Sequence, residues 1–400
     1  MSSTVLAPVS PSGPTDLSKR ALAPDLARGF MLLAIALAHT PLFVSDLDFG
    51  WQPLNDVCTF IHTLLVNNQA RPMFVFLFGY GLAQLLSRQE QRGEAWKPIR
   101  KLLRRRGIWM FVIGLAHGIL IAPVDIIAYY GVSAFAFAAM VRAKDRTLLW
   151  TAGLTFIPYV VMMTWGVFEG LQDQTSAYGS MNIATTMSDN PMENMAAAAV
   201  GMTVGALFTV PMIIPGMLLG IWAGRRRYLD EPERHRALLA RASTVLFGLG
   251  VVGGIPAAMM LTGMWNDAPE VLMWVAAAAQ PTTGMLGGIG MAGLVGLAAI
   301  KIAQNRGRVV TAIEALGQRS MTFYIFQSVV FLALFYPYTL DLADSMGLAG
   351  ATGVAVAIWL ASLVLAEALR RAGRRGPFET LLRRLSYRRR KPVPEMTTTA

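Results

Sequence analysis

Two ionisable residues, Arg28 and His39, stand within the first long apolar stretch of the sequence. They are eleven residues apart, so in an α-helix they are separated by about 1100°, roughly 20° from three full turns. They therefore share one helix face and lie about 16 Å apart along the axis. That face offers an anion-binding guanidinium at one end and a titratable base at the other. A structural interpretation stays open, in which Arg28 anchors the helix end and His39 is a packed, hydrogen-bonded core histidine.

A second pair, His117 and Asp125, flanks a turn that Pro123 predicts between two helices. Both residues should therefore lie near the same end of those helices. A carboxylate that accepts a hydrogen bond from an imidazole orients the ring and raises its basicity, an arrangement that general-base catalysis uses. The alternative is a structural hydrogen bond that closes the helical hairpin.

Three more polar residues are candidates for substrate contacts. Arg71 follows a polar run, 67–69, and its partner is either an anionic ligand or an acidic side chain. Tyr324 and Gln327 are three residues apart and share a helix face. They either reach a pocket or form hydrogen bonds with neighbouring helices.

The sequence lacks the common motifs that bind metals or phosphates. The four histidines lack the HExxH spacing, and the single cysteine excludes CxxC. No Walker-type loop is present, and the glycines between 284 and 296 fall in an apolar segment, where they favour close helix packing. We expect no metal and no tightly bound cofactor.

The elements that must position these residues are membrane helices. Hydrophobic residues make up 54% of the 400 residues and charged residues only 15%, against roughly 25% in soluble domains. The mean hydropathy is +0.47. The chain has too little polar surface for water and suits a bilayer. We predict an all-α, polytopic integral membrane protein.

Apolar stretches of about 20 residues predict about ten transmembrane helices. The predicted spans are 24–44, 71–88, 105–122, 124–141, 147–168, 197–223, 242–264, 280–300, 320–340 and 349–369. With both termini in the cytoplasm, 34 of the 35 Lys and Arg residues fall on the cytoplasmic side, as the positive-inside rule requires. Arg71 is the exception. An eleventh span at 55–69 would place the basic segment 88–106 on the outer side of the membrane. Residues 55–69 are therefore predicted to be interfacial or re-entrant.

This charge distribution also identifies the expected partners. The net charge of +11 is explained by orientation in the membrane and contact with anionic headgroups, and it does not indicate nucleic acid. We predict a multi-pass protein of the bacterial cytoplasmic membrane, with the lipid bilayer as its partner and an unknown oligomeric state. The predicted parts are a disordered tail (1–21), an N-terminal transmembrane half with the candidate site (22–223), a C-terminal transmembrane half (224–388) and a second disordered tail (389–400).

Several motifs resemble those of the YeiB-like family of bacterial membrane proteins. They are Asp25-Leu-Ala-Arg-Gly-Phe30, Phe76-Leu-Phe-Gly79, Gly114-Leu-Ala-His-Gly118, Leu316-Gly-Gln-Arg-Ser-Met-Thr-Phe-Tyr-Ile-Phe-Gln-Ser328, Gly376-Pro-Phe-Glu379 and Leu385-Ser-Tyr387. The resemblance covers residues 22–388, and its C-terminal block is the most specific part. The family is similar to a superfamily of transmembrane acyltransferases. In the related acyltransferase-three family, an arginine, ten residues and a histidine mark the first helix. Arg28 and His39 have this spacing.

The resemblance implies an acyltransferase that moves an acyl group from cytoplasmic acyl-CoA to an extracytoplasmic glycan, lipid or small-molecule acceptor. His39 would then act as general base, Arg28 would bind the CoA side or fix the helix, and His117 with Asp125 would position the acceptor. The alternative is a transporter or flippase for a lipid-linked or small anionic molecule, because intramembrane Arg and His residues also serve proton relays and transport sites.

Overall fold

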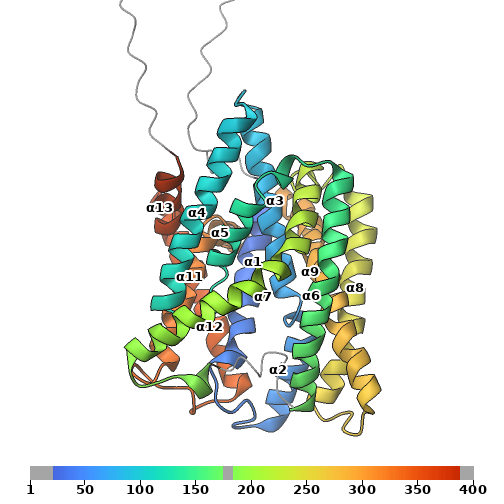
Figure 1. Ribbon diagram of the computed structural model, residues 1–400, viewed down its shortest axis with the longest axis vertical. Helices are drawn as coiled ribbons and strands as arrows, with labels where there is room; N and C mark the ends of the chain where they lie inside the picture. Colours follow the sequence, from blue (N-terminus) through green and yellow to red (C-terminus); the bar gives the residue numbers. More distant parts are fainter. Residues whose placement is uncertain (1–20, 174–182, 388–400) are drawn as a thin grey trace, which may run out of the picture.

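The computed structural model describes residues 21–173 and 183–387, and the regular structure in these ranges is helical. The α-helices are α1 (Leu22–His39), α2 (Gln52–Leu65), α3 (Ala70–Glu90), α4 (Trp96–Leu120), α5 (Ile127–Ala136), α6 (Asp145–Gln172), α7 (Pro191–Arg225), α8 (Arg236–Leu261), α9 (Glu270–Gln304), α10 (Arg308–Gly317), α11 (Ser320–Phe335), α12 (Leu348–Arg371) and α13 (Pro377–Ser386). Most of them run along the long axis of one bundle (Figure 1). The predicted all-α class is confirmed.

Six segments are long and apolar enough to cross a membrane: Leu22–Leu42, Asp145–Gln172, Pro191–Arg225, Arg236–Leu261, Glu270–Gln304 and Leu348–Arg371. The apolar helices α5 and α11 are shorter. Each of the ten predicted spans overlaps one helix, α3 and α4 included. The chain is thus built as a multi-pass membrane protein, whereas ten crossings and cytoplasmic termini stay predictions.

Helix α2 corresponds to the segment predicted to be interfacial or re-entrant. Its 14 residues span about 21 Å, too short to cross the hydrocarbon core of about 30 Å. It lies at the end of the bundle opposite α13 and the α3–α4 turn (Figure 1). Leu54, Val57, Ile61 and Leu65 on one face are exposed, and His62 on the other face is buried. This amphipathic pattern suits a helix that lies against lipid.

Basic segments that are far apart in the sequence meet at the other end of the bundle. Arg142 pairs with Glu90 at the end of α3, at 3.7 Å. Arg225 and Arg226 at the end of α7 contact Asp145 at the start of α6, at 3.1 and 2.8 Å. These loops therefore share one side, as the charge partition predicts.

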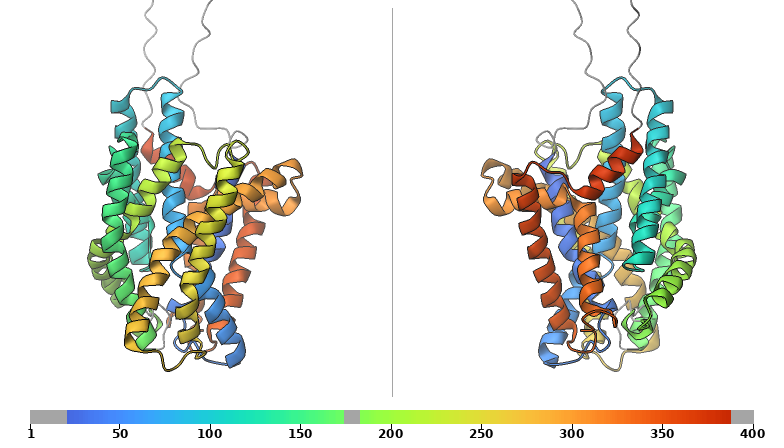
Figure 2. Two further views of the ribbon diagram at one scale, coloured as in Figure 1. Left: turned by 90° about the vertical axis from the view of Figure 1, so that its right-hand side faces the viewer. Right: turned by 90° about the vertical axis from the view of Figure 1, so that its left-hand side faces the viewer.

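The N-terminal helix α1 is embedded among helices from the C-terminal half. Gly317 of α10 packs directly against the backbone of Asp25, and the indole Nε1–H of Trp359 on α12 donates to the carbonyl of Gly29, at 3.0 Å. Helices α10 and α13 are tilted away from the bundle axis near the end where α1 begins (Figure 2). Residues from both sequence halves thus surround the start of α1.

Glycines allow helices α3 and α7 to cross with their backbones in contact. A Cβ atom on Gly79 would collide with the carbonyl of Met217, and one on Gly220 would collide with the carbonyl of Phe76. Since lipid is as apolar as the side chains, membrane helices associate mainly through such close packing. This crossing holds α3 in place, and with it the face of α3 that carries Phe74 and Phe78.

We expect Gly220→Ala to destabilise the protein by about 1–3 kcal/mol, because the added methyl group has only backbone to displace. Thermal unfolding of the purified protein in detergent, followed by tryptophan fluorescence, measures this change. The matched control is Gly153→Ala on α6, where nothing lies within 4 Å of the new methyl group. It should be neutral or stabilising by up to about 1 kcal/mol. Equal melting temperatures for the two variants would contradict the proposed role of the crossing.

Candidate functional site

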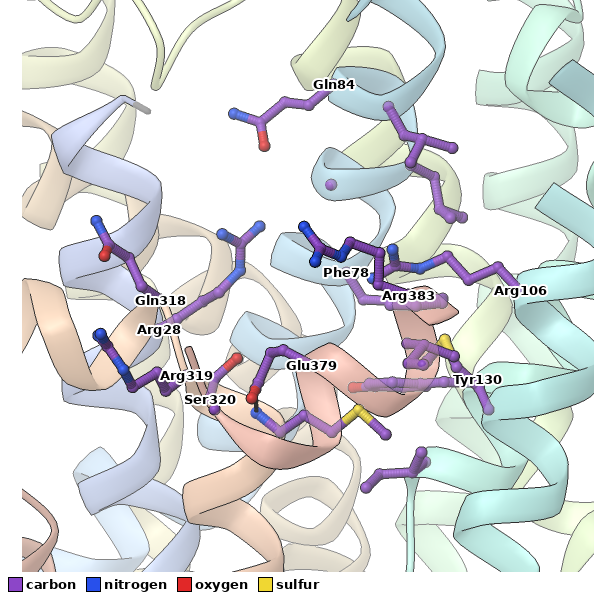
Figure 3. A pocket seen from close by; sticks show the side chains of 18 of the residues that line it. Arg28, Phe78, Gln84, Arg106, Tyr130, Gln318, Arg319, Ser320, Glu379 and Arg383 are labelled. Carbon is purple, nitrogen blue, oxygen red and sulfur yellow. Dashed lines mark hydrogen bonds between the residues drawn. The ribbon is translucent and has the colours of Figure 1, made fainter. Parts of the chain in front are cut away.

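A cavity of about 1000 Å³ lies between α1, α3, α4, α5, the α10–α11 turn and α13. Its polar lining is dominated by nine arginines: Arg28, Arg88, Arg92, Arg105, Arg106, Arg319, Arg375, Arg383 and Arg384. Arg28 points inward from one wall, and Arg106 and Arg383 point inward from the opposite wall (Figure 3). Among the described lining residues, Glu379 is the one acid. The cavity is therefore strongly positive and suits a ligand with several negative charges.

The lining changes from charged to aromatic along α3. Arg88 is 14 residues from Phe74, or about 21 Å along the helix axis. Phe74 and Phe78 pack on Tyr130 of α5, with ring centroids 4.9 and 4.4 Å apart. Tyr130 and Tyr324 both line the cavity. This shape suits an amphiphilic ligand, with its anionic part among the arginines and its less polar part against the tyrosines.

Two side chains, those of Arg319 and Glu379, hold α13 against the cavity. The buried guanidinium of Arg319 donates to the carbonyl of Arg374, at 2.7 Å, and to that of Ala315, at 2.9 Å. Desolvation by burial lowers the pKa of Arg319, an effect that the charge of nearby Glu379 opposes. Neither Arg319 nor Glu379 was predicted as a site residue, although both lie in motifs that carried the family resemblance.

Glu379 caps the N-terminus of α11. One carboxylate oxygen accepts the backbone N–H groups of Met321 and Thr322, at 2.8 and 3.1 Å, and the other accepts the Thr322 hydroxyl, at 2.5 Å. A carboxylate at this position satisfies N–H groups that the helix leaves unpaired and complements the helix dipole. The cap thereby ties α13 to the helix that carries Tyr324.

His117 and Asp125 are in contact, as their spacing predicts. His117 Nδ1 lies 2.8 Å from one oxygen of Asp125, and the backbone N–H of Ala128 donates to the other oxygen, at 2.6 Å. With Asp125 ionised, Nδ1 carries the proton and Nε2 is left with a lone pair. Nε2 is buried and has no hydrogen-bond partner among the described residues. The pair therefore presents an oriented base.

Glycines on both sides of His117 make this approach possible. A Cβ on Gly114 would lie 2.6 Å from an oxygen of Asp125, and one on Gly118 would lie 3.3 Å from the Asp125 Cβ. The motif Gly114–Gly118 thus leaves room for a carboxylate against α4. The same motif carried part of the resemblance described above.

Tyr324 joins the cavity to both predicted histidines. Its ring lines the cavity and lies 5.4 Å from the ring of His117 and 6.3 Å from that of His39. Its hydroxyl donates to the carbonyl of Val124, at 3.1 Å. The Tyr324 ring thus separates the cavity from the two histidines, and its hydroxyl group already has a hydrogen-bond acceptor.

The other predicted residues occupy three different environments. Arg28 lines the cavity and pairs with Asp25, at 2.9 Å. His39 is not among the lining residues and packs on Phe331, with centroids 6.4 Å apart. Gln327 stands between Tyr324 and Phe331 on the same face of α11, and its buried amide atoms have no partner in the described chain. The sequence therefore identified residues on both sides of Tyr324.

Arg71 lies apart from this group. Its guanidinium donates to the sulfur atoms of Met163 on α6, at 2.9 Å, and Met212 on α7, at 3.4 Å. An acidic side chain, one of the two partners that the sequence suggested, forms no ion pair with Arg71 in the described ranges.

No group of three or more His, Cys, Asp or Glu residues in the described ranges is arranged to hold a metal ion. The groups positioned for chemistry are the buried His117–Asp125 pair and the arginines of the neighbouring cavity.

These features define an all-helical, multi-pass membrane protein with an arginine-lined cavity. Residues 223–389 match the family described as a protein of unknown function, DUF418. The chain is 25% identical to the uncharacterized protein YxaH of Bacillus subtilis (strain 168), over 96% of this chain and 98% of the relative. It is 24% identical to the uncharacterized protein YeiB of Escherichia coli (strain K12), over 94% and 98%. The predicted resemblance to YeiB-like proteins is confirmed.

We expect Glu379→Ala to loosen α13, because α11 loses a cap worth about 1 kcal/mol. Limited trypsin digestion in detergent should then cleave faster between Arg375 and Gly376, as measured by mass spectrometry of the fragments. The control is Glu367→Ala on α12, whose carboxylate pairs with Arg370 and Arg371 on its own helix. If the Glu379 and Glu367 variants are cleaved at this bond at the same rate, the cap does not hold α13.

Proposed function

We propose that this protein is an acyltransferase that moves an acyl group from cytoplasmic acyl-CoA to an acceptor on the other side of the membrane. One observation carries the proposal: the buried His117–Asp125 pair lies one aromatic ring away from a cavity lined by nine arginines. The resemblance to transmembrane acyltransferases supports the same assignment.

The arginines suit the donor. The pyrophosphate and 3′-phosphate of CoA carry several negative charges, and guanidinium groups bind phosphate through paired, charge-assisted hydrogen bonds. The pantetheine arm would extend from Arg88 and Arg106 along α3 towards Tyr130, a path of about 21 Å along the helix. The thioester would then reach Tyr324, whose ring must turn aside to expose His117.

His117 is the better base of the two histidines, because Asp125 orients it and its Nε2 atom has no competing partner among the described residues. Nε2 would take the proton of an acceptor hydroxyl while its oxygen attacks the thioester carbonyl. The C–S bond would then break, and the leaving thiolate would take that proton from the imidazolium. His39, on the other side of Tyr324, would contact the acceptor.

The first test is label transfer from radiolabelled acetyl-CoA to the lipid and glycan fractions of membranes that contain the protein. We expect His117→Ala to lower transfer by about 100-fold or more, because a positioned base contributes at least that factor. Asp125→Asn should also lower transfer, since it alters the orientation and tautomer of His117. His235→Ala, in a cytoplasmic loop, is the matched control and should transfer normally.

Full activity in a folded His117→Ala variant would reject His117 as the base. A His39→Ala variant, measured in parallel, would show whether His39 takes that role instead. If no label is transferred from several acyl-CoA donors, while a proton gradient drives accumulation of an anionic solute, the protein is a transporter.

The donor-binding assignment has its own test. Arg106→Gln and Arg383→Gln should each raise the KM for acetyl-CoA by about tenfold, because each removes a charge-assisted contact to phosphate. Acetyl-dephospho-CoA, which lacks the 3′-phosphate, should be a poorer donor for the wild type. That difference should shrink in whichever variant lacks the arginine that contacts this phosphate. The control is Arg241→Gln on α8, which does not line the cavity; equal KM values for all variants would contradict the assignment.

A further inference from the structure

Arg71 continues the α3 face that forms the aromatic end of the cavity. Arg71, Phe74 and Phe78 follow the spacing i, i+3, i+7, and the two phenylalanines pack on Tyr130. Tyr130 and Tyr324 both line the cavity, and the Tyr324 ring packs against that of His117. Arg71 therefore lies on the far side of the aromatic layer of Phe74, Phe78, Tyr130 and Tyr324 from Arg88.

The guanidinium of Arg71 lacks adequate acceptors. A guanidinium has five N–H donors, and thioether sulfur is a weak acceptor. The contacts of Arg71 in the described ranges are the sulfur atoms of Met163 and Met212, and its buried Nε has no partner there. None of the ion pairs in those ranges involves Arg71.

A charge at this depth of a membrane protein is costly unless an opposite charge or water compensates it. Arg71 contacts α6 and α7, and both helices carry exposed apolar side chains: Val161 on α6 is 65% exposed and Leu207 on α7 is 73% exposed. An anion that arrives between these two helices therefore comes from the bilayer and must itself be amphiphilic.

We propose that Arg71 binds the anionic headgroup of an amphiphilic acceptor, a phosphate or carboxylate, which enters from the bilayer between α6 and α7. This inference rests on the proposed acyl transfer and names the class of acceptor. The fork of the guanidinium forms paired hydrogen bonds with either group. With its headgroup at Arg71, the acceptor would present a hydroxyl to His117 from the side opposite the donor.

Direct binding tests the site without any acyl transfer. Wild-type protein in nanodiscs of phosphatidylcholine is titrated with radiolabelled dihexanoyl phosphatidic acid and, in a second arm, with radiolabelled decanoate. We expect Arg71→Gln to weaken binding of at least one probe by about tenfold or more, because a charged hydrogen-bonded pair is lost. Arg71→Lys should retain part of the affinity, since it keeps the charge and loses the fork. The two arms distinguish a phosphate from a carboxylate site.

The controls separate charge from packing and binding from catalysis. Met163→Leu removes a sulfur contact but keeps the side-chain volume, and it should bind as the wild type does. Wild-type affinity in a folded Arg71→Gln variant, or equal competition by uncharged dihexanoylglycerol, would overturn the inference. Binding that depends on Arg71 in a protein that transfers no acyl group would reject the proposed enzyme and retain the site. Acyl transfer to a neutral acceptor that is unaffected by Arg71→Gln would reject the site at Arg71 and retain the proposed enzyme.

Discussion

The cost of placing charge in hydrocarbon governs the arrangement of this molecule. Basic residues lie at one end of the bundle. There they form ion pairs with acidic residues of neighbouring segments or line the cavity. Inside the bundle, Asp125 is compensated by His117 and by the backbone N–H of Ala128, and Arg28 is compensated by Asp25. The His117–Asp125 contact joins α4 to the segment that precedes α5, and hydrophobicity alone would not fix this contact, since lipid competes equally for apolar side chains.

Glycine is what permits these polar contacts to form at short range. His117 lies between Gly114 and Gly118 on α4. A methyl group on Gly114 would collide with the backbone of Ala128 and with Asp125, and one on Gly118 would collide with Met202. Gly317 serves α1 and α10 in the same manner, with the result that Arg28 enters the cavity wall. The small residues therefore have a chemical consequence as well as a packing one, because they set the separation between charged groups that must meet.

The helices were predictable because hydropathy is a local property: each of the ten apolar stretches overlaps one helix. The His117–Asp125 contact was also predictable, because a short turn joins the two residues. The cavity was not. Its arginines come from α1, the α3–α4 region, the α10–α11 turn and α13, and the charge rule already accounted for them as determinants of orientation. Nothing local relates Arg28 to Arg383, and the cap formed by Glu379 depends on α13 folding back onto α11.

The aromatic layer lies between the arginine-lined cavity, the two histidines and Arg71. Tyr324 lines the cavity and packs against both histidines, and Tyr130 lines the same cavity and stacks on Phe78. A donor held by phosphates and an acceptor held at Arg71 would approach this layer from opposite sides. Neither could cross it without displacing a tyrosine ring. In the proposed reaction, such a layer would keep the thioester away from water until both substrates are bound. It also explains why the base nitrogen of His117 lies buried, with no partner in the described chain.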